Sequence, residues 1–516
     1  MDRRDFVTGV GALSLASAAG ERVFAMKGTF DPVELPIDTL QTAMIAGTTS
    51  AEVLTVAYLD RIARYDHHGP EHRSVLSVNP KALADARVLD RERKAGKVRG
   101  PLHGIPILIK DNIATGDPLP TTAGSYAFEH SMRADAPLAA RLRAAGAVML
   151  GKTNLSEWAN FRSTRSCSGW SGIGGQVGNA YARDRNPSGS SAGSGVAAAA
   201  SFCAGAIGTE TNGSILSPSS MNGLVGFKPT VGLVSGRGVV PISPRQDTAG
   251  PMCRTVTDVA IMANIIAQRA LGYGSHGTSL EAFRLQGVRI GVMPMPTVAH
   301  PGTHGLFADA RTVLEKEGAA LIELKVPDAF SEIEKFSLQA LLYEFKASIN
   351  EYLAGLDPAQ VQPRSLADLI AFNQAHKDQE LVVFGQEIFE MAQECGPLSE
   401  EKYQKGRAGL DRAADTDGLA VLLGQQGVEV LMAPSNGPAE MIDPVWGDRR
   451  GGGGSQIAGA AAIAGYPSIT VPGGLVSGLP VGITFVARRD QDGLLLQVAR
   501  AYERASQARI PPHLAV

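Results

Sequence analysis

Two stretches rich in serine and glycine lie close together in the chain: Pro187-Ser188-Gly189-Ser190-Ser191-Ala192-Gly193-Ser194 and Gly208-Thr209-Glu210-Thr211-Asn212-Gly213-Ser214-Ile215. Small residues permit tight turns and close approach of the backbone. Between the stretches, residues 195–208 are so rich in Ala and Gly that we expect a buried helix of small residues. Taken alone, each serine is most simply a turn or capping residue. The flanking sequence must decide between that interpretation and a chemical one.

Upstream, an apolar run ends in polar residues: Gly104-Ile105-Pro106-Ile107-Leu108-Ile109-Lys110-Asp111-Asn112. Its turn-forming borders predict a buried strand over Pro106–Lys110. Strand alternation places Leu108 and Lys110 on one face and Ile109 and Asp111 on the other. We therefore expect Asp111 to be kept from pairing with Lys110.

Helical and strand patterns alternate along the chain, which favours an α/β layered fold. The predicted helices are residues 38–64 (with a second helix start at 49–52), 136–145, 330–356 and 456–464, and residues 280–423 are mostly helical in pattern. The other predicted strands are residues 147–150, 468–472 and 481–486. Residues 163–194 are predicted to be rich in loops, and residues 451–455 to form a hinge or a close-approach loop.

Composition excludes several classes of protein. The 516 residues (54.0 kDa) are 44% hydrophobic and 19% charged, with a net charge of −3, so the chain is globular and has no basic footprint for nucleic acid. The cysteines are far apart and no histidine pair has the spacing of a metal motif, so we expect neither a metal nor a cofactor. The four cysteines, expected to be buried as small hydrophobic residues, are Cys167, Cys203, Cys253 and Cys395.

Three short motif matches are misleading. Residues 146–153 fit the phosphate-loop pattern, but the four middle residues are themselves an apolar strand. Residues 399–402 fit S-x-x-K without the accompanying motifs of that class. Residues 189–193 fit the nucleophile elbow G-x-S-x-G, yet a polar segment ending in Pro187 precedes them where an apolar strand is needed.

Taken together, the motifs resemble the amidase signature family. Both opening stretches and the lysine segment match it, as do residues 151–154, 223–230 and 479–482. The resemblance covers residues 37–500 and is strongest over 101–256. It implies a single large α/β domain, assigned to residues 26–516, with a mixed, mostly parallel central sheet flanked by helices. Asp111 and Glu210 are interpreted as hydrogen-bonding residues of the scaffold.

The resemblance also implies a Ser–cis-Ser–Lys catalytic set without histidine. Carried over by position, the nucleophile is Ser214 and the base is Lys110. The bridging serine is Ser190, whose peptide bond to Gly189 is implied to be cis. The oxyanion hole is implied to consist of four backbone N–H groups, those of Thr211, Asn212, Gly213 and Ser214.

A lysine can act as a base only when it is neutral. Its ordinary pKa is about 10.4, and burial lowers it because a low dielectric disfavours the charged form. A fall of about two to three units would bring Lys110 near working pH, where general-base catalysis is most effective. The proposed chemistry therefore requires the Lys110 nitrogen to lie in a dry pocket within reach of the two serines.

Departures from the family pattern bear on the substrate. Asn212-Gly213 stands where Gly-Gly is common, Ser188 and Ala192 replace frequent glycines, and Leu216 replaces a frequent arginine. Together with the export signal described next, this variant looks most like the peptide amidases, which hydrolyse C-terminal peptide carboxamides. Three alternatives stay open: a broad aryl or aliphatic amidase, an ammonia-supplying subunit of glutamyl-tRNA amidotransferase, and a catalytically idle binding protein. The expected partner is a small-molecule or peptide amide, not nucleic acid.

Residues 1–25 resemble a twin-arginine signal peptide. Arg3-Arg4 precedes a mildly apolar stretch, residues 7–19, that is too short to span a bilayer. Small residues at Ala18 or Ala25 offer cleavage sites. The sequence therefore predicts a periplasmic or secreted protein without membrane attachment after export, and it leaves the oligomeric state open.

Overall fold

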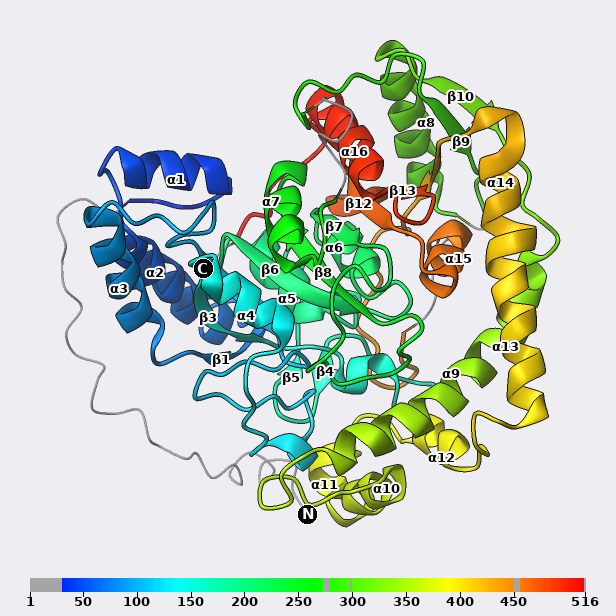
Figure 1. Cartoon of the computed structure of the whole chain (residues 1–516), viewed down its shortest axis with the longest axis horizontal. Coiled ribbons are helices and arrows are strands. Elements are labelled where there is room, and N and C mark those ends of the chain that lie inside the picture. The colour runs from blue at the N-terminus through cyan, green and yellow to red at the C-terminus, as the bar shows by residue number, and fades with distance from the viewer. Residues whose placement is uncertain (1–29, 272–278, 297–298, 449–454, 515–516) are drawn as a thin grey trace, which may run out of the picture.

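A mixed sheet crosses the centre of the molecule, with helices packed around it (Figure 1). The computed structural model describes residues 30–271, 279–296, 299–448 and 455–514. Within those ranges the sheet has 11 strands in the spatial order β1 (Val75–Val78), β3 (Val148–Thr153), β2 (Pro106–Lys110), β6 (Gly205–Glu210), β8 (Thr248–Cys253), β7 (Val225–Lys228), β12 (Ser468–Val476), β13 (Leu479–Ala487), β11 (Val430–Pro434), β9 (Arg289–Val292) and β10 (Ala320–Glu323). A separate pair consists of β4 (Trp170–Ser171) and β5 (Gly175–Gln176).

The helices cover the sheet and extend beyond it. They are α1 (Ile37–Ile45), α2 (Ala51–Arg61), α3 (Ala82–Lys94), α4 (Pro137–Ala144), α5 (Ala192–Ala199), α6 (Leu216–Met221), α7 (Val256–Ile266), α8 (Pro301–Lys316), α9 (Phe330–Ala354), α10 (Leu366–Ala375), α11 (Lys377–Glu380), α12 (Glu387–Gln393), α13 (Glu401–Ala414), α14 (Ala420–Gly424), α15 (Gln456–Ala464) and α16 (Asp492–Ser506). Short π- or 3₁₀-helical turns are η1 (Ile62–His67), η2 (Tyr126–Phe128), η3 (Glu157–Asn160), η4 (Asp415–Leu419) and η5 (Gln425–Gly427).

The mixed α/β architecture expected from the sequence is confirmed. Among the described strands, parallel pairing occurs in two groups, β3-β2-β6 and β11-β9-β10. The strands between these groups pair antiparallel, as does the edge strand β1. Part of the reason is the two-residue connection Ser477-Gly478 between β12 and β13, because only antiparallel neighbours can be joined so tightly.

The predicted helix over residues 195–208 is wrong in its bounds. Helix α5 is entirely buried, as expected for small residues, but it lies over Ala192–Ala199. Gly205–Glu210 forms β6, a strand hydrogen-bonded to β2 on one side and β8 on the other. Backbone pairing on both edges outweighs local preference here, because Ala and Gly fit either a buried helix or a buried strand.

The other predicted elements are found with shifted ends. The pattern over residues 38–64 is two helices, and the Ser50 hydroxyl accepts from the N–H of Val53 where α2 begins. Strands β2 and β3 and helices α4, α9 and α15 occur where the sequence predicts them. Residues 280–423 are mostly helical but contribute β9 and β10 as well, short strands that the helical pattern around them hides.

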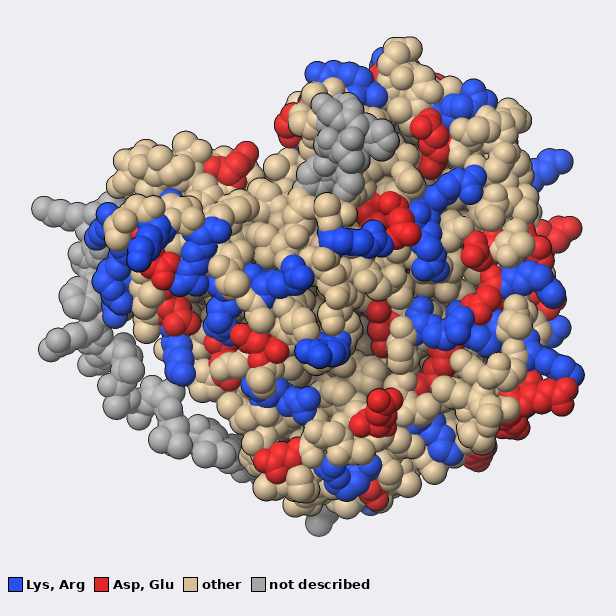
Figure 2. Space-filling view, in the orientation of Figure 1, with Lys and Arg blue, Asp and Glu red and all other residues tan. Residues whose placement is uncertain are grey.

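Helices α9 and α13 lie side by side at the outer edge of the molecule (Figure 1). Figure 2 shows acidic and basic side chains interspersed over this face, in keeping with the small net charge. Cys167, Cys203 and Cys253 are buried as expected, whereas Cys395 is half-buried. In the parts of the chain that are described, no helix is both long and apolar enough to cross a membrane. The predicted signal peptide and most of the predicted loop at 451–455 lie outside the described residues.

Candidate active site

Lys110 ends β2, which lies between β3 and β6 in the sheet, and its side chain is completely buried. Its Nζ lies 2.8 Å from the Ser190 Oγ and 2.8 Å from the Thr209 Oγ1, with the Thr209 carbonyl oxygen at 3.5 Å. Within the described chain no carboxylate pairs with this amine. The amine is therefore surrounded by neutral oxygen atoms.

Burial lowers the pKa of Lys110 from its ordinary 10.5 to about 7, although the carboxylates of Asp247 and Glu210 oppose the shift. Desolvation dominates because the protonated amine would lose its hydration without gaining a close counter-ion. A substantial fraction of Lys110 is therefore neutral near pH 7, the condition that a lysine base requires.

Asp111 faces away from Lys110, as strand alternation predicts. One of its oxygens accepts hydrogen bonds from the backbone and hydroxyl of Thr122, and the other lies 3.3 Å from the Lys152 Nζ. Both members of this ion pair are buried. The nearest acid in sequence is thus paired with a different lysine, which is why it leaves the pKa of Lys110 free to fall.

Ser190 and Ser214 come together at the start of α5 and just before α6. The peptide bond from Gly189 to Ser190 is cis, as the resemblance implies. The N–H of the next residue, Ser191, donates to the Ser214 carbonyl at 3.2 Å, which ties the two serine segments together. Ser190 is fully buried, whereas Ser214 keeps 9% of its surface exposed. In this part of the described structure the Ser214 hydroxyl makes no hydrogen bond.

The predicted oxyanion segment forms a tight loop between β6 and α6. Throughout the described structure, none of the four backbone N–H groups from Thr211 to Ser214 donates a hydrogen bond. Gly213 adopts the left-handed conformation with φ +81°, which glycine accepts without steric penalty. Asn212 does not need that conformation, so its replacement of the common glycine leaves the loop intact. These four backbone donors are thus without a partner among the described residues.

Glu210 hydrogen-bonds to the backbone at the end of this loop, as expected for a residue of the scaffold. Its Oε2 accepts from the backbone N–H groups of Ile215 at 2.8 Å and Leu216 at 3.1 Å. The carboxylate thereby holds the two residues that follow Ser214. Its position agrees with a supporting role rather than a direct one.

Three polar residues of the site escaped the sequence interpretation. Thr209 receives hydrogen bonds from Lys110 and, at 3.0 Å, from the Asn112 Nδ2. The Ser191 hydroxyl donates to the Thr209 carbonyl and accepts from its N–H, at 3.0 and 3.1 Å. All three occur inside the quoted motifs, yet only the alternation of β6 signals that Thr209 faces Lys110.

A surface loop, residues 435–448, contacts α6 at one end and the residues that precede the Ser190 segment at the other. At its start the Asn436 Nδ2 donates to Ser217 Oγ at 2.6 Å. At its end the Asp448 carboxylate accepts from Ser168 and from Asn186. Trp446, near the end of this loop, is 63% exposed.

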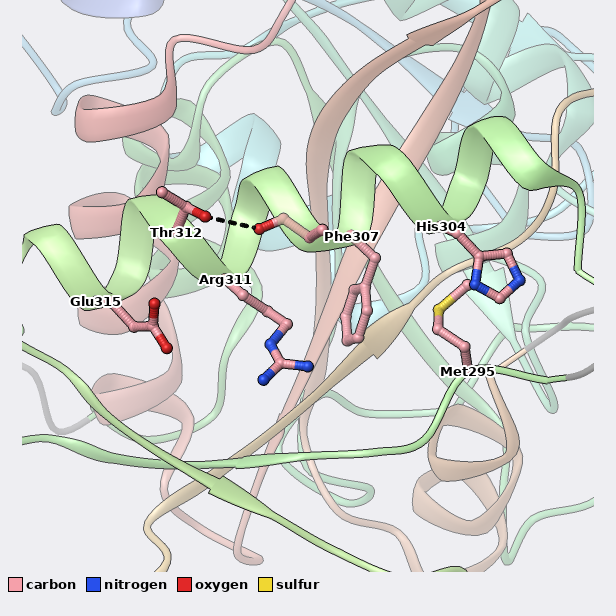
Figure 3. Close-up of a pocket in the computed structure, with 7 residues that line it drawn as sticks. Met295, His304, Phe307, Arg311, Thr312 and Glu315 are labelled. Atoms are coloured by element: carbon pink, nitrogen blue, oxygen red, sulfur yellow. Dashed lines mark hydrogen bonds between the residues drawn. The ribbon is translucent and has the colours of Figure 1, made fainter.

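Another cavity, of about 310 Å³, lies against α8 and does not overlap the site. Figure 3 shows the side chains of Phe307, Arg311 and Glu315 projecting from one side of this helix. His304 lies in the first turn of the helix, and Met295, from the segment before it, lies next to His304. None of the predicted catalytic residues lines it. The candidate active site therefore remains the buried Lys110 and the serine loops above it.

Comparisons with known proteins show that the chain is an amide-hydrolysing enzyme. The amidase family model matches residues 53–496. A probable amidase of Arabidopsis thaliana is 38% identical, covering 97% of this chain and 95% of the relative. The native peptide amidase of Stenotrophomonas maltophilia is 44% identical with a TM-score of 0.87, covering 94% of this chain and 99% of that one. A glutamyl-tRNA(Gln) amidotransferase subunit of Chloroflexus aurantiacus is 30% identical, covering 92% of this chain and 97% of the relative.

The chain therefore belongs to the amidase signature family. Its similarity to proteins that differ in their printed functions means that family membership alone leaves the substrate open.

Proposed function

We propose that this protein hydrolyses C-terminal carboxamides of peptides through an acyl-enzyme formed on Ser214. Ser190 relays protons, neutral Lys110 is the base, and the N–H groups of residues 211–214 bind the oxyanion. The observation that carries the proposal is the environment of Lys110, which is fully buried and hydrogen-bonded only to hydroxyl and carbonyl oxygens among the described residues.

The contacts of Lys110 suit a neutral amine. Such an amine has two N–H donors and one lone pair. Its donors can serve the Thr209 hydroxyl and carbonyl, which leaves the lone pair to accept from the Ser190 hydroxyl. Ser190 is then free to accept the proton of Ser214. We expect this last hydrogen bond to form when substrate binds, because catalytic hydrogen bonds often tighten only in the complex.

The proton path balances over one turnover. As the Ser214 oxygen attacks the amide carbon, its proton passes to Ser190 and the Ser190 proton passes to Lys110. The carbonyl oxygen becomes the oxyanion held by the free N–H groups. When the C–N bond breaks, Ser190 gives a proton to the leaving nitrogen and regains one from Lys110. Water then attacks the acyl-enzyme by the same relay, releasing the carboxylic acid and restoring the Ser214 hydroxyl.

Similarity to a peptide amidase supports the choice of substrate. The match to that peptide amidase has 44% identity and covers 94% of this chain. For the amidotransferase relative the identity is 30% over a similar share of the chain. A broad aryl or aliphatic amidase is the competing hypothesis that the experiment below distinguishes.

We also propose that residues 1–25 export the protein by a twin-arginine route. The Arg3-Arg4 pair followed by a short apolar stretch supports this proposal. Lysine substitution of both arginines should leave the protein in the cytoplasmic fraction of a bacterial host. An unchanged distribution between cytoplasm and periplasm would rule out this signal.

A panel of primary amides tests the substrate class. Ammonia release is measured for a blocked dipeptide amide, benzamide, a long-chain fatty amide and glutamine. We expect kcat/KM for the dipeptide amide to exceed the others by at least about a hundredfold, since extended binding contributes to transition-state stabilisation. Comparable values for benzamide would instead support the broad amidase, and a preference for glutamine would support the amidotransferase-like activity.

Ser214→Ala is the control for that panel. The variant should fold normally, release no ammonia above background and fail to react with a fluorophosphonate, whose phosphorus bonds to the serine oxygen as fluoride leaves. Labelling of the wild type but not of the variant identifies the nucleophile. If the wild type neither reacts with the probe nor hydrolyses any amide, the chain is an idle binding protein.

A further inference from the structure

Asp247 lies directly behind the oxyanion loop. It precedes Thr248, the first residue of β8, which pairs with Glu210 at the end of β6. This register puts Asp247 opposite Thr211, and its Oδ1 accepts from the Thr211 hydroxyl at 2.5 Å. The other oxygen accepts from the backbone N–H groups of Ile242 and Ser243 at 2.8 and 2.9 Å. The carboxylate is thus fixed by two backbone donors while it holds Thr211.

Gln246 holds the same residue from the other side. Its Nε2 donates to the Thr211 carbonyl at 3.1 Å, and its Oε1 accepts from Arg407 of α13 at 3.0 Å. Arg407 lies 3.5 Å from Glu344 of α9 and 2.5 Å from Asp411. Asp247 and Gln246 therefore hydrogen-bond to the hydroxyl and the carbonyl of Thr211, respectively. Arg407 of α13 and Glu344 of α9 lie behind Gln246.

Asp247 also acts on Lys110 through space. Among the charged groups that raise the pKa of Lys110 against desolvation, Asp247 has the largest effect and Glu210 the next. Burial raises the pKa of Asp247 itself to about 6. The other charged group that acts on Asp247 is Glu344, and Arg407 approaches through Gln246.

We infer that Asp247 is a positioning residue for amide hydrolysis, which orients the oxyanion loop by holding the Thr211 hydroxyl. It does not touch the reacting atoms. The negative charge of Asp247 has a separate, supporting effect, because it opposes the fall in the pKa of Lys110 that burial causes. This inference rests on the proposed function, because both of the groups that Asp247 serves belong to it.

Asp247→Asn separates charge from hydrogen bonding. The asparagine oxygen can accept from Ile242 and Ser243 while its NH₂ group donates to the Thr211 hydroxyl, so the number of hydrogen bonds is kept. Loss of the negative charge disfavours protonated Lys110. We expect the acid limb of kcat/KM against pH to move to lower pH by about half a unit or more.

Thr211→Val tests the other role, since it removes the hydroxyl but keeps the charge. We expect kcat to fall by about tenfold to a hundredfold, with KM nearly unchanged, because displaced donors lose transition-state stabilisation. Its acid limb should stay close to that of the wild type. Thr211→Ser, which restores the hydroxyl, should recover most of the lost kcat.

Asp411→Asn is the matched control. It removes the same charge from the far end of the network, where Asp411 is half-exposed and pairs with Arg407 and Arg245. Its acid limb should coincide with that of the wild type. Circular dichroism and thermal unfolding establish that each variant is folded. If Asp247→Asn does not fold, the Thr211 variants alone decide the orienting role.

The inference is overturned if Thr211→Val keeps full kcat. An acid limb that does not move in folded Asp247→Asn rejects the effect of the charge on Lys110. Failure of the proposed function looks different. In that case Lys110→Met would stay active, or the wild type would show no acid limb near pH 7. Full kcat in Thr211→Val, in an enzyme whose activity is abolished by Lys110→Met, would reject this inference alone.

Discussion

Lys110 combines complete burial with the absence, among the described residues, of a paired carboxylate. Its folded-state pKa is about 7 against an ordinary value of 10.5. Between these two values the unfolded chain binds a proton that the folded chain lacks. The stability of the folded state must therefore rise with pH across this window, and below about pH 7 the full cost of burying the group is present.

Lys110→Met should accordingly stabilise the protein while it abolishes activity. The gain in melting temperature over the wild type should be larger at pH 7 than at pH 10, because the penalty removed falls by about 1.4 kcal/mol per pH unit in this window. Turnover should fall by at least about a hundredfold with loss of the base. Thermal unfolding at the two pH values and ammonia release measure both effects. A variant that keeps near-normal rates would reject the assigned base.

Sequence reasoning located the main chemical groups because they sit in long motifs. The cis bond at Ser190, the burial of Lys110 and the separation of Asp111 from Lys110 are all found as expected. Thr209 was missed, since a threonine in a small-residue strand carries no sign of its neighbours across the sheet. Asp247 was missed for a related reason. Its contact with Thr211 depends on the pairing of β6 with β8, which local sequence does not specify.

At the scale of elements, the oxyanion loop depends on one backbone conformation. Gly213 has φ +81°, and a Cβ built there would meet no atom within 4 Å. Gly213→Ala therefore introduces backbone strain without a steric clash. We expect a loss of about 1 kcal/mol in stability and a clear fall in kcat, because the loop relaxes away from the strained conformation and its N–H groups move.

Gly232 provides the matched control for that substitution. It has φ +88°, also with no atom within 4 Å of a built Cβ, and it lies in the connection from β7 to β8. Gly232→Ala should lose a similar amount of stability while kcat stays at the wild-type value. Equal falls in kcat for both variants would show that the effect is general softening of the fold. Chemical denaturation and steady-state kinetics give the two readouts.

Elements made of small residues are where prediction from the sequence failed. The bounds of α5 and β6 were merged into one helix, since Ala and Gly carry neither a helical nor a strand periodicity of hydrophobic residues. Strand β2 was predicted correctly because an Ile- and Leu-rich run stands between clear turn residues. In the charged region, β9 and β10 are each four residues long, too short for alternation to identify them.

At the scale of the whole molecule, a buried ion cluster joins helix α11 to the loops around the site. Arg162 is fully buried, with its Nη1 2.7 Å from Glu157 Oε1 and 3.5 Å from Glu380 Oε2. Glu380 ends α11, and its other oxygen accepts from Ser125 Oγ at 2.8 Å and from Tyr126 N at 2.7 Å. The cluster thus connects segments more than 200 residues apart in sequence.

Arg162→Met should destabilise the protein by about 3–5 kcal/mol, because it leaves buried carboxylates without their counter-ion. Burial already raises the pKa of Glu157 well above its usual 4.5, and loss of the guanidinium raises it further. Both folded proteins bind a proton that the unfolded chain releases, and the variant keeps that proton to higher pH. The deficit should therefore grow once the pH passes the raised pKa of Glu157 in the wild type. Thermal unfolding between pH 5 and pH 8 measures this trend.

An exposed ion pair is the comparison for that cluster. Arg73 pairs with Glu71 at 3.3 Å, and both side chains are largely in solvent. Arg73→Met should change stability by less than about 1 kcal/mol, with little dependence on pH. If both variants lose the same stability, the buried ion cluster does not hold α11 in place.

The loop at residues 435–448 carries an exposed tryptophan whose fluorescence can report on the loop. Of its three tryptophans, Trp158 and Trp170 are 2% and 7% exposed, whereas Trp446 on this loop is 63% exposed. Acrylamide should therefore quench the emission of Trp446 far more strongly than that of the other two. Because Asn436 of this loop hydrogen-bonds to Ser217 in α6, a ligand that displaces the loop should change the quenching of that one indole, without a label or a coupled assay.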